Sequence, residues 1–200
     1  MVETTIYFLR HGITESNRMG VWQLSMDEEL SSEGLSQAEA VSGVIRQLHP
    51  DVIVSSPMKR ALKTAKVVSA SIDAGSIVTI PELSERRGGV IEGLTSSQIL
   101  EKFGIEMHLI LDKSIDRLPG VESISDFRRR VMDAVNIIDQ MFSNRKVLAV
   151  THGGVMRAFY TFYVSNNGER KTFRNCSILG VRKENGIWES IYSLNTEYRE

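Results

Sequence analysis

Short apolar runs alternate with longer amphipathic patterns along most of this 200-residue chain, and the alternation limits the folds open to it. The short runs are rich in β-branched residues, which favour strands, and the longer patterns repeat apolar residues at helical spacing. Strands are predicted at residues 5–9, 52–55, 76–80 and 147–151, and helices from Ser32 to His49, from Ser56 to about Val68 and from Ser123 or Ser125 to Phe142. Such alternation is typical of an α/β sandwich around a mostly parallel sheet.

The last part of the chain predicts a hairpin. Asn185-Gly186 separates two strand-like runs, at residues 177–183 and 187–193. This dipeptide favours the tight turn that joins two antiparallel strands. With helices on both faces of the sheet, the expected architecture is a three-layer α/β/α sandwich.

The middle of the chain departs from the regular pattern. A helical segment at about residues 96–112 is interrupted at Gly104, and Pro119-Gly120 breaks the pattern again. We expect an irregular insertion over about residues 94–122 that covers the substrate. No linker, internal repeat or low-complexity segment divides the chain, so residues 1–200 are predicted to form a single domain.

Composition excludes several classes of protein. The formal net charge is −1, from 24 basic and 25 acidic side chains, which gives no overall attraction for nucleic acid. The single cysteine, Cys176, excludes an intramolecular disulfide framework and suits a reducing compartment. No apolar stretch approaches the roughly 20 residues that a membrane span requires. We therefore expect a cytoplasmic protein with no nucleic-acid or membrane partner.

Two histidines occupy equivalent places in the predicted sheet. His11 and His152 each follow a strand and each precede a glycine. Ligands of parallel sheets bind beyond the carboxyl ends of the strands, where these ends meet, so we expect both imidazoles at one edge. Arg10 adjoins the first histidine, and Arg60 lies in the first turn of the helix that follows a third strand.

These residue types suit phosphoryl transfer. A neutral imidazole attacks phosphorus when one ring nitrogen is held as a donor and the other presents its lone pair. Gly12 would let the backbone approach His11 closely enough to hold it. A transferring phosphoryl group needs fixed cationic donors, which the two arginines and a protonated His152 would supply. The leaving alkoxide needs a proton and the later water needs a base, and Glu85 is the candidate for both tasks.

Residues 9–17, Leu-Arg-His-Gly-Ile-Thr-Glu-Ser-Asn, resemble the L-R-H-G-x-T-x-x-N signature of the histidine phosphatase superfamily, which includes the cofactor-dependent phosphoglycerate mutases. The similarity continues in the family's order to about residue 180. Its further segments are residues 27–34, 55–65, 83–85, 89–93, 120–123 and 150–154. The resemblance implies a phosphoglycerate mutase-like α/β fold.

The resemblance also implies a role for each matching residue. His11 would be the phosphorylated nucleophile, and Glu85 the proton donor and acceptor. Arg10, Arg60 and His152 would hold the phosphoryl group. The further phosphate or substrate contacts that we expect are Asn17, the backbone N–H of Gly153, and then Gln23, Leu24, Arg86 and Glu122. The family needs no metal, and 2,3-bisphosphoglycerate would be a cofactor only for a mutase.

Three functions are compatible with these residues. The first is a metal-independent phosphatase that hydrolyses a small phosphorylated metabolite through a phosphohistidine. The second is a phosphoglycerate mutase, but the lysine and arginine pair of the mutases has no clear match in residues 94–118. The third is a catalytically silent phosphate-binding regulatory domain, suggested by departures from the family pattern at Leu24 and Ile91. The physiological substrate and the oligomeric state stay open.

Two other motifs have simpler interpretations. Residues 176–182 satisfy the C-x₅-R pattern of cysteine phosphatases, but the residues between are strand-like and lead into a hairpin rather than a helix. Cys176 is therefore expected to be a partly buried core residue. Arg128-Arg129-Arg130 is expected to be the solvated face of an amphipathic helix.

Overall fold

A computed structural model describes residues 3–72, 75–106, 113–165 and 170–199. Its centre is a six-stranded sheet in the order β3-β2-β4-β1-β5-β6. The strands are β1 (Thr5–Arg10), β2 (Val52–Ser55), β3 (Ile77–Thr79), β4 (Lys146–Thr151), β5 (Arg170–Glu184) and β6 (Ile187–Arg199). The first four strands of that order pair in parallel, and β5 and β6 pair antiparallel. The mostly parallel sheet is confirmed.

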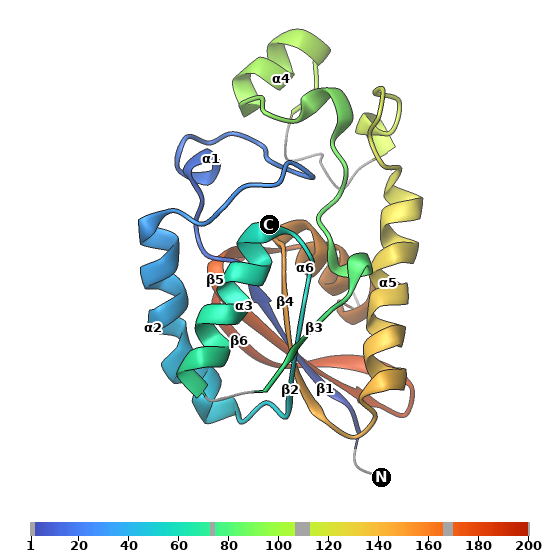
Figure 1. Cartoon of the computed structure of the whole chain (residues 1–200). Coiled ribbons are helices and arrows are strands. Elements are labelled where there is room, and N and C mark those ends of the chain that lie inside the picture. Colours follow the sequence, from blue (N-terminus) through green and yellow to red (C-terminus); the bar gives the residue numbers. More distant parts are fainter. Residues whose placement is uncertain (1–2, 73–74, 107–112, 166–169, 200) are drawn as a thin grey trace.

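Helices cover both faces of this sheet (Figure 1), which confirms the three-layer sandwich. One face packs against α2 (Ser32–Leu48) and α3 (Lys59–Ile72), and the other packs against α5 (Ile124–Met141) and α6 (Gly153–Phe159). Side chains of β1 alternate between the two cores, because successive residues of a strand point to opposite faces. Ile6 and Phe8 lie in the α5 and α6 core, and Tyr7 and Leu9 lie in the α2 and α3 core.

Local capping residues set the helix ends close to the predicted positions. Ser31, rather than the predicted Ser32, caps α2 and accepts the N–H of Gly34 at 3.1 Å. Ser123, one of the two candidates, caps α5 and accepts the N–H of Asp126 at 3.0 Å. Serine favours this position because its hydroxyl satisfies an N–H group that has no partner inside the helix.

The hairpin is longer than predicted, although its turn is where the sequence places it. Asn185 and Gly186 both have positive φ, at 50° and 84°, as the tight turn requires. The pairing of β5 with β6 shifts register between Phe173 and Ile178. A bulge of this kind interrupts strict alternation, so the sequence pattern shows only the part of β5 beyond it.

Parallel pairing brings three strand ends to one edge of the sheet. Arg10 pairs with Thr151, and Ser55 pairs with Val150. The residues that follow β1, β2 and β4 therefore emerge side by side. This confirms the prediction that His11 and His152 share one edge.

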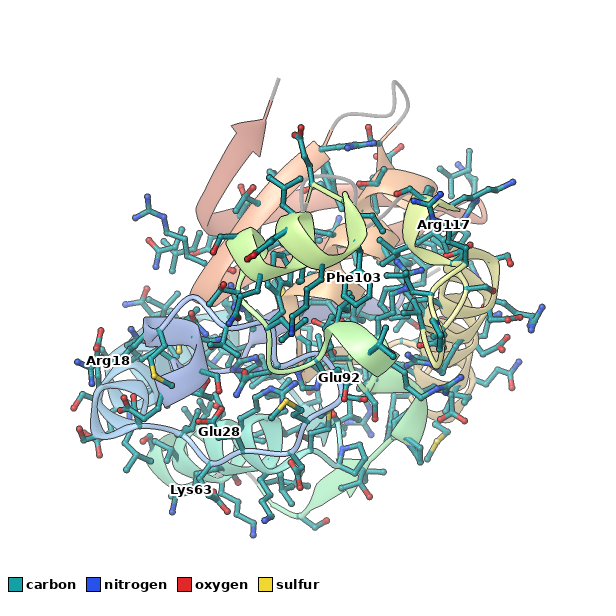
Figure 2. The ribbon with its side chains drawn as sticks, turned by 90° about the horizontal axis from the view of Figure 1, so that it is seen from above. Arg18, Glu28, Lys63, Glu92, Phe103 and Arg117 are labelled. Carbon is teal, nitrogen blue, oxygen red and sulfur yellow. The ribbon has the colours of Figure 1, made fainter. Side chains whose placement is uncertain are left out.

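A separate set of segments lies over this edge, and we call residues 91–106 and 113–121 together with the loop 20–26 the cap. The predicted insertion at 94–122 contains α4 (Ser96–Phe103) and the short η4 (Lys113–Ile115), while its residues 107–112 lie outside the described ones. Figure 2 looks down on this end of the molecule, with α4 lying across the view. Five buried residues form the cap cluster: Leu24, Ile91, Ile99, Ile105 and Ile115. No helix of the described segments is long and apolar enough to cross a membrane.

The remaining short elements lie outside the sheet and its four main helices. They are α1 (Glu15–Arg18), η1 (Pro81–Leu83), η2 (Gly89–Ile91) and the π-helical turn η5 (Tyr160–Val164). Glu92, near the centre of Figure 2, ties two of the connecting segments together. Its Oε1 accepts the backbone N–H groups of Ser25 and Gly88 at 3.1 and 2.8 Å. These two hydrogen bonds attach the loop 20–26 to the β3–α4 connection, in addition to the apolar contacts of the cap cluster.

Candidate active site

A cavity of about 400 Å³ opens between the sheet edge and the cap. Its inner wall carries four of the predicted residues: Arg10, His11, Arg60 and Glu85. We call these four, with His152 directly behind them, the catalytic floor. The cavity is also lined by the other predicted residues Asn17, Gln23, Leu24, Arg86 and Gly153.

His11 is held as a neutral imidazole with a defined tautomer. Its Nδ1 lies 2.7 Å from the carbonyl oxygen of Gly12, which can only accept, so Nδ1 carries the proton. Its Nε2 accepts the Nε–H of Arg60 at 3.3 Å, so Nε2 carries the lone pair. Burial, and then the charges of Arg10 and Arg60, hold the pKa of His11 well below its ordinary value. The floor therefore presents a neutral nitrogen nucleophile.

The glycine after the nucleophile serves a packing purpose as well. A Cβ on Gly12 would lie 2.4 Å from the carbonyl oxygen of Gly34 in α2. The missing side chain thus allows the first turn of α2 to approach the loop after β1. The Gly12 N–H also donates to the hydroxyl of Thr64 at 3.1 Å, which ties the same loop to α3.

The two arginines of the floor are anchored by backbone carbonyls. Arg60 is 1% exposed, and its Nη1 and Nη2 donate to the carbonyls of Met26 and Leu24 at 2.6 and 2.7 Å. Arg10 donates from Nη1 to the carbonyl of Phe173 at 2.7 Å, while its buried Nε has no partner among the described residues. Burial, followed by the nearby charge of Arg157, lowers the pKa of Arg10 to about 10. Both guanidinium groups remain charged at neutral pH.

His152 lies beside His11 at the edge of the sheet. Its ring centroid lies 5.2 Å from that of His11, and its Nε2 lies 2.8 Å from the hydroxyl of Ser56. Burial, then the charges of Arg60 and the neighbouring groups, hold the pKa of His152 well below its ordinary value. Burial and these charges favour the neutral ring, and a protonated His152 beside a phosphoryl group stays a prediction. Its buried Nδ1 has no hydrogen-bond partner among the residues described.

Glu85 is held by two backbone N–H groups across the cavity. Its Oε2 accepts the N–H of Gly154 at 2.8 Å, and its Oε1 accepts the N–H of Arg86 at 2.9 Å. A Cβ on Gly154 would lie 2.1 Å from Oε1, so only glycine leaves room for the carboxylate there. Gly154 was not predicted as a site residue, although the Gly153-Gly154 pair was visible in the sequence.

Three amide side chains in the wall of the cavity are hydrogen-bonded to one another and to the backbone of His11. Asn175 donates from Nδ2 to the carbonyl of His11 at 3.0 Å and lies 3.2 Å from Oδ1 of Asn17. Asn17 in turn donates to the side-chain carbonyl of Gln23 at 3.3 Å. The sequence did not indicate Asn175, because it lies in the β5 bulge, where alternation fails. Ser56 was interpreted only as a helix cap.

Arg86 and Glu122 are less available to a substrate than expected. Arg86 donates from Nη2 to Asp116 at 2.6 Å and from Nε to the carbonyl of Glu122 at 2.8 Å. Glu122 is 4% exposed and is absent from the wall of the cavity. Its carboxylate faces Arg130 and the N–H of Arg87 instead. The expectation that Glu122 contacts the substrate directly is therefore not met.

The arginine run on α5 is not uniformly solvated. Arg129 is exposed and pairs with Asp126. The guanidinium of Arg128 lies 3.9 Å from the ring centroid of Phe162. Arg130 points inward, with a side chain only 20% exposed. The predicted interpretation is therefore wrong for Arg130, because helical rotation carries successive residues from the exposed side of α5 to its flank.

The alternative of a cysteine nucleophile finds no support in the geometry. Cys176 is buried in the β5 bulge, and burial raises the pKa of its thiol to about 12. A thiol of that pKa is a poor nucleophile at neutral pH. In the described part of the chain, no three His, Cys, Asp or Glu side chains gather closely enough to hold a metal ion.

Comparisons with known proteins agree with this geometry. A family model for the histidine phosphatase superfamily (branch 1) matches residues 6–194. A metal-independent phosphoserine phosphatase of Arabidopsis thaliana is 32% identical over 160 residues, which are 78% of this chain and 67% of that protein. A 2,3-bisphosphoglycerate-dependent phosphoglycerate mutase of Cytophaga hutchinsonii is 30% identical over 157 residues, 76% of this chain and 74% of the mutase.

Solved structures show the same likeness. A mycobacterial glucosyl-3-phosphoglycerate phosphatase in complex with VO3 superposes with a TM-score of 0.81 at 26% identity. The match covers 96% of this chain and 98% of the mycobacterial one.

Proposed function

The chain belongs to branch 1 of the histidine phosphatase superfamily, and on that premise we propose that it hydrolyses phosphomonoesters of small metabolites through a phosphohistidine, without a metal or organic cofactor. The observation that carries this proposal is the state of His11. Its ring is neutral, its Nδ1 donates to Gly12, and its Nε2 lone pair lies at the floor of the cavity. Nucleophilic catalysis by histidine requires this arrangement.

The first half of the reaction transfers the phosphoryl group to the protein. Nε2 of His11 attacks phosphorus, an N–P bond forms, and the P–O bond to the leaving group breaks. Arg10 and Arg60 stabilise the negative charge on the phosphoryl oxygens. Two buried atoms without partners in the described residues, Nε of Arg10 and Nδ1 of His152, are further candidates to contact the phosphoryl group. Glu85 gives its proton to the departing alkoxide.

The second half returns the protein to its resting state. Glu85, now a carboxylate, takes a proton from water, and the resulting hydroxide attacks the phosphohistidine. The N–P bond breaks, inorganic phosphate leaves, and the lone pair returns to Nε2 of His11. One carboxyl group thus performs both proton transfers from a fixed position beside Gly154.

The similarity to phosphoglycerate mutases keeps a mutase as the second candidate. A mutase holds a sugar acid with further cationic groups while the phosphoryl group returns to it. Here Arg86, one of the expected substrate contacts, is bound to Asp116 at 2.6 Å and to the carbonyl of Glu122. This engagement of Arg86 favours hydrolysis. The intact floor likewise favours an enzyme over a silent phosphate-binding domain.

Release of inorganic phosphate tests the proposal. The wild-type protein should hydrolyse p-nitrophenyl phosphate and members of a panel of sugar and amino-acid phosphates, with unchanged rates in the presence of a chelator. No turnover of any substrate by folded protein would refute the hydrolase, and loss of activity in the chelator would refute the metal-free mechanism. Interconversion of phosphoglycerates faster than their hydrolysis would establish the mutase instead.

A further inference from the structure

Arg130 uses every N–H group of its guanidinium. Its Nε and Nη2 donate to the two carboxylate oxygens of Glu122, at 2.9 and 2.8 Å. Its Nη1 donates to the carbonyls of Glu82 and Ser84, at 2.9 and 2.7 Å, and Nη2 also reaches the carbonyl of Glu85 at 3.3 Å. A guanidinium has five N–H donors in a planar fork, and here all five have acceptors. Such complete use indicates a fixed geometry rather than a solvated charge.

Glu122 is fixed in turn, so it serves as a rigid anchor for the fork. Its side chain is 3% exposed, and its Oε2 also accepts the N–H of Arg87 at 3.2 Å. Burial raises the pKa of Glu122, but the hydrogen bonds and charge of Arg130 outweigh burial and hold that pKa below its ordinary value. The carboxylate therefore stays ionised at neutral pH. A bidentate arginine–carboxylate pair of this kind fixes both position and orientation.

The other N–H groups of the Arg130 guanidinium hold the segment that carries Glu85, the proposed proton donor and acceptor. The three carbonyls that Arg130 binds belong to residues 82–85, which end at Glu85 itself. The Glu85 carboxylate then reaches Gly154 and the N–H of Arg86. Arg130 does not line the cavity and lies behind the segment rather than beside a substrate. It thus acts on the backbone from which the Glu85 side chain extends.

We propose that Arg130 is a positioning residue, which clamps residues 82–85 to α5 through Glu122 and so holds Glu85 at the distance that proton transfer requires. This inference rests on the proposed function, in which Glu85 is the proton donor. General acid catalysis depends on heavy-atom distances near those of a hydrogen bond, so a small displacement of the loop weakens it strongly. A lysine keeps the positive charge but has no planar fork, so it cannot bind Glu122 and three carbonyls together.

The test compares Arg130→Lys with Arg129→Lys, the same change one residue earlier on the exposed side of α5. Values of kcat/KM are measured for a series of aryl and alkyl phosphates with leaving groups of increasing pKa. Arg130→Lys should lower kcat/KM by about tenfold to a hundredfold for alkyl phosphates, which need the acid, and by less than about threefold for p-nitrophenyl phosphate. Arg129→Lys should match the wild type across the series.

A double variant shows whether Arg130 acts through Glu85. In a Glu85→Gln background, Arg130→Lys should cause no further loss on alkyl phosphates, because the proton donor is already gone. Equal losses across all leaving groups, or a full additional loss in the double variant, would overturn the inference. If Arg130→Lys does not fold, Glu122→Gln provides the same test, because it weakens the anchor and keeps the guanidinium.

The same series separates failure of the inference from failure of the proposed function. If the wild type hydrolyses no phosphomonoester, or if Glu85→Gln shows no dependence on the leaving group, the proposed role of Glu85 falls and this inference falls with it. If Glu85→Gln behaves as expected while Arg130→Lys does not, only the inference is overturned.

Discussion

The catalytic floor and the cap enclose one cavity but are built in opposite ways. Four of the floor residues lie at strand ends or in the first turn of a helix, and Glu85 lies in the connection between β3 and α4. Polar contacts hold each of them in place. Among the described residues, the cap cluster is apolar, has five buried members, and forms a core separate from the two that flank the sheet. The floor is thus attached to the two main cores, whereas the described part of the cap packs on its own cluster.

This difference separates chemistry from selectivity. Phosphoryl transfer needs donors held within fractions of an ångström, and a sheet edge supplies that rigidity. Choice among leaving groups needs only a wall of suitable shape, which a small apolar cluster over the edge supplies. Loss of the nucleophile or of the arginines in the floor should therefore lower the rate with every substrate, whereas loss of Glu85 should lower it most for poor leaving groups. Changes in the cap should affect substrates according to the shape of the leaving group.

The largest effect is expected for His11→Ala, which removes the proposed nucleophile from the floor. Turnover should fall by at least about 10⁴-fold, as in other enzymes that lose a nucleophile, and acid-labile labelling by radioactive substrate should vanish. His49→Asn is the matched control, because His49 is an exposed cap of α2 with φ of 51°, a conformation that asparagine tolerates. Undiminished labelling of the alanine variant would place the nucleophile elsewhere.

Gly154→Ala tests whether the position of the Glu85 carboxylate in the floor sets the rate for poor leaving groups. The added Cβ would occupy the place of the Glu85 carboxylate, and because that carboxylate ends a flexible side chain, Glu85 moves rather than the helix. We expect kcat/KM for alkyl phosphates to fall by about tenfold to a hundredfold, with a change in the free energy of unfolding below about 1 kcal/mol.

Gly43→Ala is the control for this change. Nothing lies within 4 Å of a Cβ at that position on α2, so activity should be unchanged. Alanine is the better helix former, so Gly43→Ala should raise the free energy of unfolding by about 0.5–1 kcal/mol. Unchanged leaving-group dependence in Gly154→Ala would show that the overlap does not displace Glu85.

The sequence predicted the floor better than the cap for a physical reason. Strand ends in a parallel sheet meet wherever the strands pair, so residues placed directly after β1 and β4 had to converge. His11 and His152 could therefore be assigned from position alone. Cap residues have no such constraint. Irregular segments pack through tertiary contacts, and these contacts leave no helical or strand periodicity in the sequence.

The position of Arg130 shows the limit of local sequence patterns. Arg130 belongs to a charged run, and composition alone favours solvent exposure for such a run. Only the fold shows that one of its three arginines faces the carbonyls of residues 82–85.

Acidification should lower the free energy of unfolding through the two histidines of the floor. The folded protein holds the pKa values of His11 and His152 well below that of a histidine in the unfolded chain, so the unfolded state binds more protons below about pH 6.5. The stabilising contribution is present above pH 6.5 and is lost as the pH falls, by up to about 1.4 kcal/mol per pH unit for each histidine. Urea unfolding of the wild type and of His152→Gln, at pH 7.5 and 5.5, measures this. A variant with the same pH dependence as the wild type would contradict it.

The smallest effect is expected for Leu24→Gly in the cap, at a position where the sequence departs from the family pattern. Leu24 has a positive φ of 48°, and glycine relieves that strain by about 1–2 kcal/mol. Leu24 is also buried, and losing its side chain from the cap cluster costs about 2–3 kcal/mol. Burial therefore outweighs strain, and the free energy of unfolding should fall by about 1 kcal/mol.

The activity of Leu24→Gly decides whether the cap controls selectivity. The Leu24 carbonyl that holds Arg60 belongs to the backbone and survives the change, so kcat for p-nitrophenyl phosphate should stay within about threefold of the wild type. The side chain lines the cavity, so KM for phosphomonoesters with bulky apolar leaving groups should change by up to about tenfold relative to KM for small polar ones. Leu100→Ala, on the exposed side of α4, should leave both values unchanged. A uniform loss of kcat across substrates would mean that Leu24 belongs to the floor, through its hold on Arg60, and that the boundary between the two regions lies further out in the cap.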